Sequence, residues 1–228
     1  DRWECDFIEV REKSHRGVYF QKFEICEQFS HYRRILQLDA DMLIRVDCPS
    51  PFDLVPNNKV GVVSAAQHPW DRVLRMHRRN SNNKWMKRVY GSNARRIKIP
   101  NDEEIVNGGF YLYSPTAHQK LFKYLLKHAE VFDYEGGEQP LISLALQNEY
   151  STLPHWLPHD FNSTGSDRYC SEPGKMNRFI YHFLGGCTEK RRIEKTNWQK
   201  IPHISMMRRS RALVERLPKD RSLIGAEI

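Results

Sequence analysis

The sequence has no apolar segment long enough to cross a bilayer. Its longest apolar runs, such as residues 60–66, fall far short of the roughly 20 residues that a spanning helix needs. It also has no apolar leader, because residues 1–16 are charged. The chain does not begin with Met, so an upstream segment or a membrane anchor could have been removed. We expect the chain itself to be soluble, and cytoplasmic in the absence of such a segment.

Cysteine is scarce and is poorly arranged for cross-links or for metal binding. The five cysteines are odd in number, widely spaced and form no CxxC pair. Neither a zinc site nor a disulfide framework is therefore predicted, and we expect reduced thiols. These residues are Cys5, Cys26, Cys48, Cys170 and Cys187. Internal repeats and low-complexity segments are missing as well.

The composition is that of one globular domain. Of the 228 residues, 39% are hydrophobic, 11% aromatic and 28% charged, which is enough apolar material for one core. We therefore predict a single domain over residues 1–228. The formal net charge of +8, concentrated in residues 72–96, 190–200 and 208–221, favours an anionic partner such as nucleotide phosphates, an acidic acceptor, a membrane surface or nucleic acid. A solvated basic surface would show the same balance.

Apolar patterns alternate between strand and helix along the chain. Short apolar runs predict strands at residues 35–38, 60–66, 105–113 and 179–184. Helical spacing predicts helices at residues 18–29, 115–129 and 138–147, a helical excursion at 70–90, and a basic helix at 205–217 within a C-terminal tail, 205–228. Residues 155–175 are predicted as loop. The alternation predicts one α/β domain with a mostly parallel central sheet flanked by helices.

Two carboxylates, Asp39 and Asp41, follow the apolar strand at residues 35–38. Residues two apart on a strand point to the same side, so Ala40 turns away while both carboxylates face one space. They would repel each other and lose hydration unless a divalent cation, usually with a phosphate beyond it, occupied the gap. A helix cap or a solvated turn can carry the same pattern, and phosphatases with an aspartyl nucleophile also place Asp-x-Asp after a strand. The pattern indicates a candidate metal–diphosphate site.

Three later segments carry polar residues beside glycines. Asn107 precedes Gly108-Gly109 in a strand, where the backbone approaches another group closely or forms a β-bulge. Glu138 and Gln139 lie at the predicted start of a helix, after a glycine pair. They are either a functional pair or part of a capping turn, in which Glu138 would lie favourably near the helix dipole. His182 ends an apolar strand beside a glycine turn, where a structural histidine is the commoner case.

The order of these motifs resembles that of the glycogenin-like glycosyltransferases, which include bacterial lipooligosaccharide galactosyltransferases. The resemblance runs from about residue 18 to about residue 186. It rests on Gln21-Lys22-Phe23, Leu38-Asp39-Ala40-Asp41, Val106-Asn107-Gly108-Gly109, Gly136-Gly137-Glu138-Gln139, Leu157-Pro158-His159-Asp160-Phe161-Asn162 and His182-Phe183-Leu184-Gly185, in that order. It implies a GT-A (Rossmann-like) domain that transfers a hexose from a nucleotide-diphosphate sugar with retention of configuration. A UDP-sugar is the first expectation for the donor.

The resemblance also implies roles for single residues. Asp39, Asp41 and His182 would hold a metal, and their oxygen and imidazole donors suit Mn²⁺, with Mg²⁺ as the alternative. The donor nucleotide sugar would be bound by Lys22, Asp39, Ala40, Asp41, Gly185 and Lys190. The catalytic candidates around the sugar are Asn107, Glu138 and Gln139. The acceptor, whether glycan, lipid or protein, stays open, and nucleic acid is not expected as a partner.

The sequence departs from that family at three places. Glu138-Gln139 stands where the family usually has Asp-Gln, and Thr188 stands where it commonly has a lysine, with Lys190 two residues further on. Only 38 residues precede Asp39, so part of the nucleotide-binding segment could be missing. Two alternatives remain open at this point: an aspartyl-phosphate type of Mg²⁺-dependent phosphohydrolase, and a non-catalytic basic module that binds acidic polymers.

Overall fold

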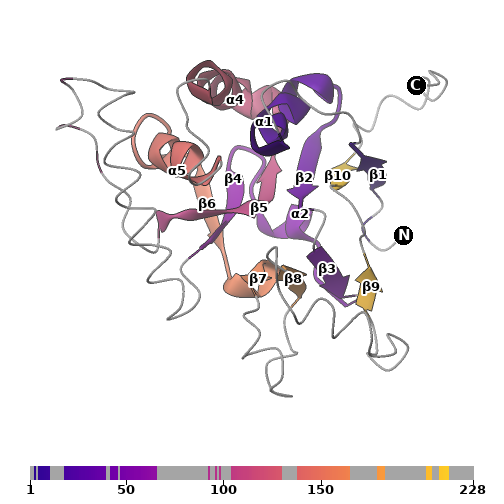
Figure 1. The fold of residues 1–228 in the computed structure, drawn as a ribbon. Helices are drawn as coiled ribbons and strands as arrows, with labels where there is room; N and C mark the ends of the chain where they lie inside the picture. The colour runs from indigo at the N-terminus through magenta and orange to yellow at the C-terminus, as the bar shows by residue number, and fades with distance from the viewer. Residues whose placement is uncertain are drawn as a thin grey trace.

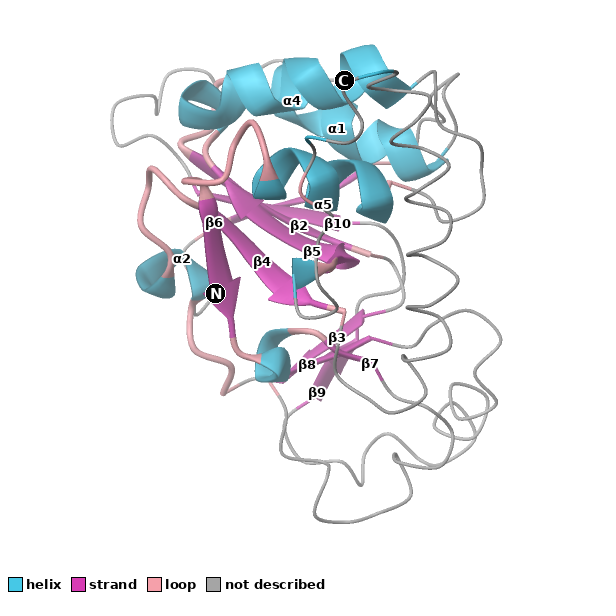
Figure 2. Cartoon of the chain, turned by 90° about the vertical axis from the view of Figure 1, so that its left-hand side faces the viewer, coloured by secondary structure: helices cyan, strands magenta, loops and turns pink. Residues whose placement is uncertain are grey.

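The protein folds as a layer of helices on a six-stranded sheet, with a smaller four-stranded sheet at one end (Figures 1 and 2). The structure is a computed structural model. It describes residues 3, 5–10, 18–39, 42–45, 47–65, 92, 96, 98, 104–129, 138–164, 179–182, 204–206 and 211–215. The predicted helical excursion at residues 70–90 lies outside these ranges.

The described helices are α1 (Val18–Gln28), α2 (Pro51–Leu54), α4 (Pro115–Ala129) and α5 (Gln139–Gln147), followed by the 3-10 helix η3 (His159–Phe161). The sequence pattern predicts α1, α4 and α5, but not α2 or η3. Helix α4 starts at Pro115, whose missing N–H costs nothing in a first turn. It buries Leu121, Phe122 and Leu125 on its inner face. The predicted helices at residues 18–29, 115–129 and 138–147 are confirmed.

The strands belong to two sheets. The large sheet has the order β1 (Asp6–Glu9), β10 (Arg211–Glu215), β2 (Arg34–Leu38), β5 (Val106–Tyr113), β4 (Val60–Ser64) and β6 (Pro154–Leu157). The small sheet has the order β7 (Ser163–Thr164), β8 (Ile180–His182), β3 (Met42–Arg45) and β9 (Ile204–Met206). The strands predicted at residues 35–38, 60–66, 105–113 and 179–184 correspond to β2, β4, β5 and β8.

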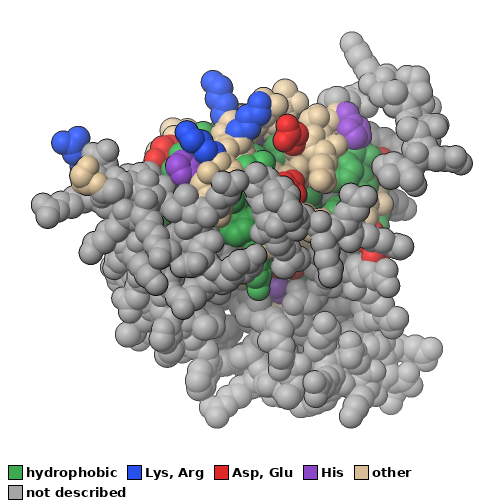
Figure 3. Space-filling model, turned by 45° about the horizontal axis from the view of Figure 1, so that its top comes forward, with side chains coloured by type: hydrophobic (Ala, Val, Ile, Leu, Met, Phe, Trp, Pro, Cys, Tyr) green, Lys and Arg blue, Asp and Glu red, His purple; other side chains and the backbone are tan. Residues whose placement is uncertain are grey.

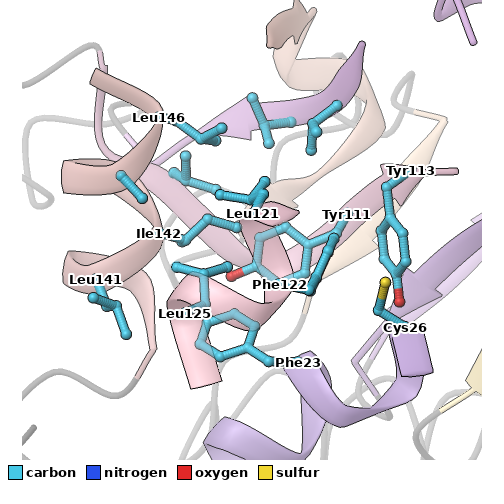
Figure 4. Packing of buried hydrophobic residues seen from close by; sticks show 14 of the residues in the cluster. Phe23, Cys26, Tyr111, Tyr113, Leu121, Phe122, Leu125, Leu141, Ile142 and Leu146 are labelled. Atoms are coloured by element: carbon cyan, nitrogen blue, oxygen red, sulfur yellow. The ribbon is translucent and has the colours of Figure 1, made fainter. Parts of the chain in front are cut away.

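The core consists of two apolar clusters, and strand β5 contributes to both. Tyr111 and Tyr113 pack in the cluster that contains Phe23 of α1 and Phe122 of α4 (Figure 4). Phe110 lies in the second cluster, with Leu36, Met42 and Phe161 among its members. Successive side chains on a strand point to opposite faces, which explains how one strand supplies both clusters.

Three predictions about the chain's secondary structure are wrong. The sheets are mostly antiparallel, because among the described pairs only β4–β6 and β7–β8 are parallel. The physical reason is that β2 has as neighbours β10 and β5, two segments from distant parts of the chain that run opposite to it. The described residues of the basic helix predicted at 205–217 belong instead to strands β9 and β10, and part of the loop predicted at 155–175 forms β6, η3 and β7. Pairing with neighbouring strands overrides local propensity there.

The outer side of the helical layer carries basic residues. Lys120, Lys123 and Lys127 are exposed on α4, and Figure 3 shows lysine and arginine side chains standing on this side of the molecule. Among the described helices, none has the length and apolar character needed to cross a membrane.

Candidate active site

Lys22 lies at the centre of a cluster of polar groups from four segments. Its ammonium nitrogen lies 2.6 Å from Asp39 Oδ1 and 2.7 Å from Glu138 Oε1, and it donates a hydrogen bond to the Gly108 carbonyl oxygen at 2.8 Å. An ammonium group has three N–H donors, and each finds an acceptor here. Helix α1, the end of β2, strand β5 and the start of α5 are thereby joined at one point.

The charges in this cluster stabilise one another. Burial alone would lower the pKa of Lys22, but the carboxylates of Asp39 and Glu138 outweigh it and hold this pKa above its ordinary value. Burial raises the pKa of Glu138; Lys22 opposes that change and Asp39 adds to it. With both carboxylates ionised, the three groups together carry one negative charge, which is the charge that a cation would meet.

Two glycines allow this close approach. A Cβ at Gly108 would lie 2.1 Å from Glu138 Oε1, and one at Gly109 would lie 2.4 Å from His182 Cε1 and 2.5 Å from Met42 Cε. The pairing of β4 with β5 also shifts register between Val62 and Ser64, opposite this segment. The sequence offered two interpretations of the glycine pair, a β-bulge and a close approach of the backbone to another group. Both hold, because the strand has an irregular register and its backbone lies close to neighbouring groups.

Asn107 lies in the same strand and is buried. Its side-chain Oδ1 accepts a hydrogen bond from the Gly109 backbone N–H at 2.9 Å, while the Gly109 carbonyl accepts one from the Asp39 backbone N–H at 3.1 Å. Asn107 thus supports the backbone that faces the site. This contact indicates a structural contribution for a residue that the resemblance places near the donor sugar.

His182 reaches the cluster from the small sheet. Strand β8 pairs with β3, so that His182 lies opposite Met42. Its Nδ1 lies 3.0 Å from Asn162 Oδ1, and because an amide oxygen can only accept, this contact is a hydrogen bond in the tautomer that carries the proton on Nδ1. Nε2 lies 3.7 Å from Asp39 Oδ2. An imidazole held at one nitrogen while the other faces a carboxylate is typical of a metal ligand with an outer partner.

Asp39 and His182 are the two predicted metal ligands that the structure describes. Asp39 Oδ2 and His182 Nε2 lie 3.7 Å apart, which is wider than the roughly 3.0 Å between neighbouring ligands of an octahedral site, so the two side chains would have to move closer to bind one cation together. An oxygen and an imidazole nitrogen suit Mn²⁺. Within the described part of the chain, no group of three or more His, Cys, Asp or Glu side chains could hold a metal ion. Asp41, the third predicted ligand, lies outside that part, as do Ala40, Gly185 and Lys190.

Gln139 and Tyr111 complete the described surroundings. Gln139 Oε1 is buried and has no hydrogen-bond partner among the described residues, which is uncommon for a buried acceptor. Tyr111, which is fully buried, donates its hydroxyl hydrogen to Glu138 Oε1 over 3.4 Å. Sequence reasoning missed Tyr111, because an aromatic residue in an apolar strand is typical of a core position. It also missed Asn162 as a partner of His182, although Asn162 ends one of the motifs quoted above.

The sequence matches no protein-family profile and no curated protein. Among solved structures, the chain is similar to the WbbM bifunctional glycosyltransferase, with a TM-score of 0.50 and 13% identity over 78% of this chain and 33% of WbbM. It is also similar to mouse xyloside xylosyltransferase 1, with a TM-score of 0.46 and 19% identity over 78% of this chain and 68% of that one. For the galactosyltransferase LgtC, in complex with donor and acceptor sugar analogues, the TM-score is 0.46 and the identity 16%, over 82% and 69%.

The likeness to WbbM is one of fold. The chain spans about a third of the length of that protein. The α/β arrangement described above is thus the fold of the GT-A glycosyltransferases, as the order of the sequence motifs predicted. On this fold one residue from each of five motifs lies in the same cluster: Lys22, Asp39, Gly108, Glu138 and His182.

Proposed function

We propose that this protein is a glycosyltransferase that moves a sugar from a nucleotide-diphosphate sugar to a glycan, lipid or protein acceptor. A UDP-sugar is the first candidate for the donor. One observation carries the proposal. Lys22, Asp39, Gly108, Glu138 and His182 belong to five separate motifs, and they meet in one cluster on a glycosyltransferase fold. Independent structural roles for five such motifs would not require them to meet.

The reaction requires stabilisation of negative charge. The acceptor oxygen bonds to the anomeric carbon and passes its proton to the departing diphosphate, while the bond from that carbon to the diphosphate breaks and the diphosphate leaves with the electron pair. Asp39, Asp41 and His182 would hold Mn²⁺ or Mg²⁺, and a bound cation would supply positive charge next to the leaving diphosphate. Lys190, beyond Gly185, is the candidate for a further phosphate contact. We expect retention of the anomeric configuration.

The three residues predicted near the sugar would have different parts in the site. Gln139 presents a buried acceptor oxygen with no described partner, which fits a hydrogen bond from a sugar hydroxyl or a role at the reaction centre. Asn107 holds the Gly109 backbone next to Asp39 and so shapes the wall of the site. Glu138 is 1% exposed, which places it behind Lys22.

One contact favours transfer over phosphate-ester hydrolysis. A phosphohydrolase of the aspartyl type needs a later acidic pair for magnesium, and the only acidic cluster suited to that part spans residues 101–104. Of this cluster Glu104 is described, and it lies 2.9 Å from Lys98, whose backbone N–H donates to Asn148 just beyond the end of α5. The Lys22 cluster meets the opposite end of α5, so Glu104 is not placed beside Asp39.

The test combines donor binding with turnover. The wild-type protein is screened by thermal shift against nucleotide sugars with and without Mn²⁺, and release of the nucleoside diphosphate is then measured with the donor that stabilises it. Asp39→Asn should lower metal-dependent turnover by about 100-fold or more, because a charge-stabilising group is lost from the transition state.

Asp53→Asn is the matched control for this substitution. It makes the same charge change on the exposed surface of α2, and it should leave turnover unchanged. Full activity of the wild-type protein in EDTA would rule out the metal-dependent mechanism. Hydrolysis of p-nitrophenyl phosphate that disappears in Asp39→Asn would instead favour the phosphohydrolase.

A further inference from the structure

The two oxygens of the Asp39 carboxylate face different partners. Oδ1 lies 2.6 Å from Lys22 Nζ, and Oδ2 lies 3.7 Å from His182 Nε2. A carboxylate that turned freely about its Cβ–Cγ bond would present either oxygen to either side. The contact with Lys22 sets this rotation, so it holds one carboxylate oxygen in the direction of the candidate cation position.

Lys22 is in turn held in place by Glu138. The Lys22 side chain is long and flexible, and one ion pair at a surface would not order it. Here its ammonium group is 2.7 Å from Glu138 Oε1 and 2.8 Å from the Gly108 carbonyl oxygen, and the side chain is 13% exposed. Glu138 Oε1 also accepts from the Tyr111 hydroxyl at 3.4 Å, in the interior of the protein. Glu138 therefore connects the rigid core to the lysine that orients Asp39.

Gly108 makes room for this arrangement. With a Cβ at position 108, the nearest atom would be Glu138 Oε1 at 2.1 Å, followed by Gln139 Cγ at 2.8 Å. The carboxylate of Glu138 thus occupies the space that a side chain at 108 would fill. A glutamate reaches that far, whereas an aspartate in the same place would be shorter by one carbon.

Glu138 also matters through its charge. A lysine beside a metal ligand repels a cation, and that repulsion is offset when the lysine shares its charge with a second carboxylate. Asp39 and Glu138 both contact Lys22, which leaves one net negative charge in the group. Without the charge of Glu138, Lys22 would neutralise Asp39 completely.

We propose that Glu138 is a positioning residue for the cation site. It acts through Lys22: it holds the lysine that orients Asp39, and it offsets the positive charge of that lysine, and both effects raise the affinity for Mn²⁺. The inference rests on the proposed function, because it assumes that Asp39 is a metal ligand. This role takes the place of the predicted contact between Glu138 and the sugar, because Glu138 lies behind Lys22 and is 1% exposed.

The test measures binding of Mn²⁺ alone to the purified full chain, by titration of free Mn²⁺ with electron paramagnetic resonance. Glu138→Gln keeps the shape of the side chain and removes its charge, and it should weaken Mn²⁺ binding by about 10- to 100-fold, as loss of an outer partner of a metal ligand does. Glu27→Gln is the control, because it makes the same charge change on the exposed face of the same helix that carries Lys22. Unchanged Mn²⁺ affinity in folded Glu138→Gln overturns the inference.

Two further variants keep the test decisive if Glu138→Gln does not fold. Glu138→Asp keeps the charge but withdraws it from Lys22, and Gly108→Ala pushes the carboxylate away. Both should weaken Mn²⁺ binding, and wild-type affinity in both overturns the inference. Asp39→Asn separates the two hypotheses. If this variant loses Mn²⁺ and the Glu138 variants do not, only the inference fails; if wild type binds no Mn²⁺, the proposed cation site fails with it.

Discussion

Replacement of Gly109 by alanine tests whether the site depends on the close contact between β5 and His182. The added Cβ would lie 2.4 Å from His182 Cε1, 2.6 Å from His182 Nδ1 and 2.5 Å from Met42 Cε. Carbon atoms in ordinary contact are about 3.5–4.0 Å apart, so the neighbours have to move by about 1 Å. The Met42 methyl group ends a flexible side chain and can turn away, whereas His182 is 3% exposed and is held by Asn162.

The expected cost in stability is that of an overpacked core, about 1–3 kcal/mol in the free energy of unfolding. Displacement of His182 should also break the 3.0 Å contact between its Nδ1 and Asn162 Oδ1 and change the separation of Nε2 from Asp39. We therefore expect Gly109→Ala to lower both stability and Mn²⁺-dependent turnover. A misplacement of about 1 Å in a catalytic group can cost on the order of 100-fold in rate.

Gly61→Ala is the matched control. A Cβ at Gly61 would lie 2.8 Å from Val55 Cγ2 and 3.1 Å from Leu112 Cβ, which are core contacts that do not involve the site. Urea unfolding should show comparable losses of stability for the two variants, and assays well below the unfolding transition should show lost turnover only for Gly109→Ala. Wild-type turnover and Mn²⁺ affinity in Gly109→Ala would refute the reasoning that places His182 against this glycine.

Two further predictions concern buried groups away from the cluster. Burial lowers the pKa of His118 below 6.5, and its Nδ1 accepts a hydrogen bond from the Ser114 backbone N–H. The neutral form of His118 therefore stabilises the fold above pH 6.5. This contribution to the free energy of unfolding should decline as the pH falls below 6.5. Urea unfolding at pH 7.5 and 5.5 should show a smaller pH effect in His118→Gln than in wild type, and equal effects would contradict this assignment. Burial raises the pKa of the Cys26 thiol to about 12, so Cys26 should resist a disulfide reagent at pH 8 in the native protein and react only after unfolding. Mass spectrometry of the labelled cysteines checks this, and rapid native labelling of Cys26 would show that its site is open.

Much of the local structure is predictable from the sequence, because it depends on neighbouring residues. The proline and the apolar spacing of residues 115–129 specify α4 from its first residue to its last. The run of apolar residues before Asp39 specifies β2. The order of the motifs also selected Lys22, Asp39, Glu138 and His182 as site residues, and the structure brings these four together.

The tertiary structure decided what depends on contacts between distant segments. The direction of the strands is set by which segments pair, and the pairing of β10 with β2 joins positions more than 170 residues apart. A local pattern cannot show which distant segments pair, so the predictions of a mostly parallel sheet and of a C-terminal helix were wrong.

The roles within the site follow the same rule. Sequence alone identified Glu138 as a polar residue at a helix start, and the fold showed that it is buried behind Lys22 against Tyr111 and Gly108. A residue's chemical type is local, but its partners are chosen by packing. The motifs therefore identified which side chains belong to the candidate site, and the fold determined which of them contact one another, because those contacts join distant segments.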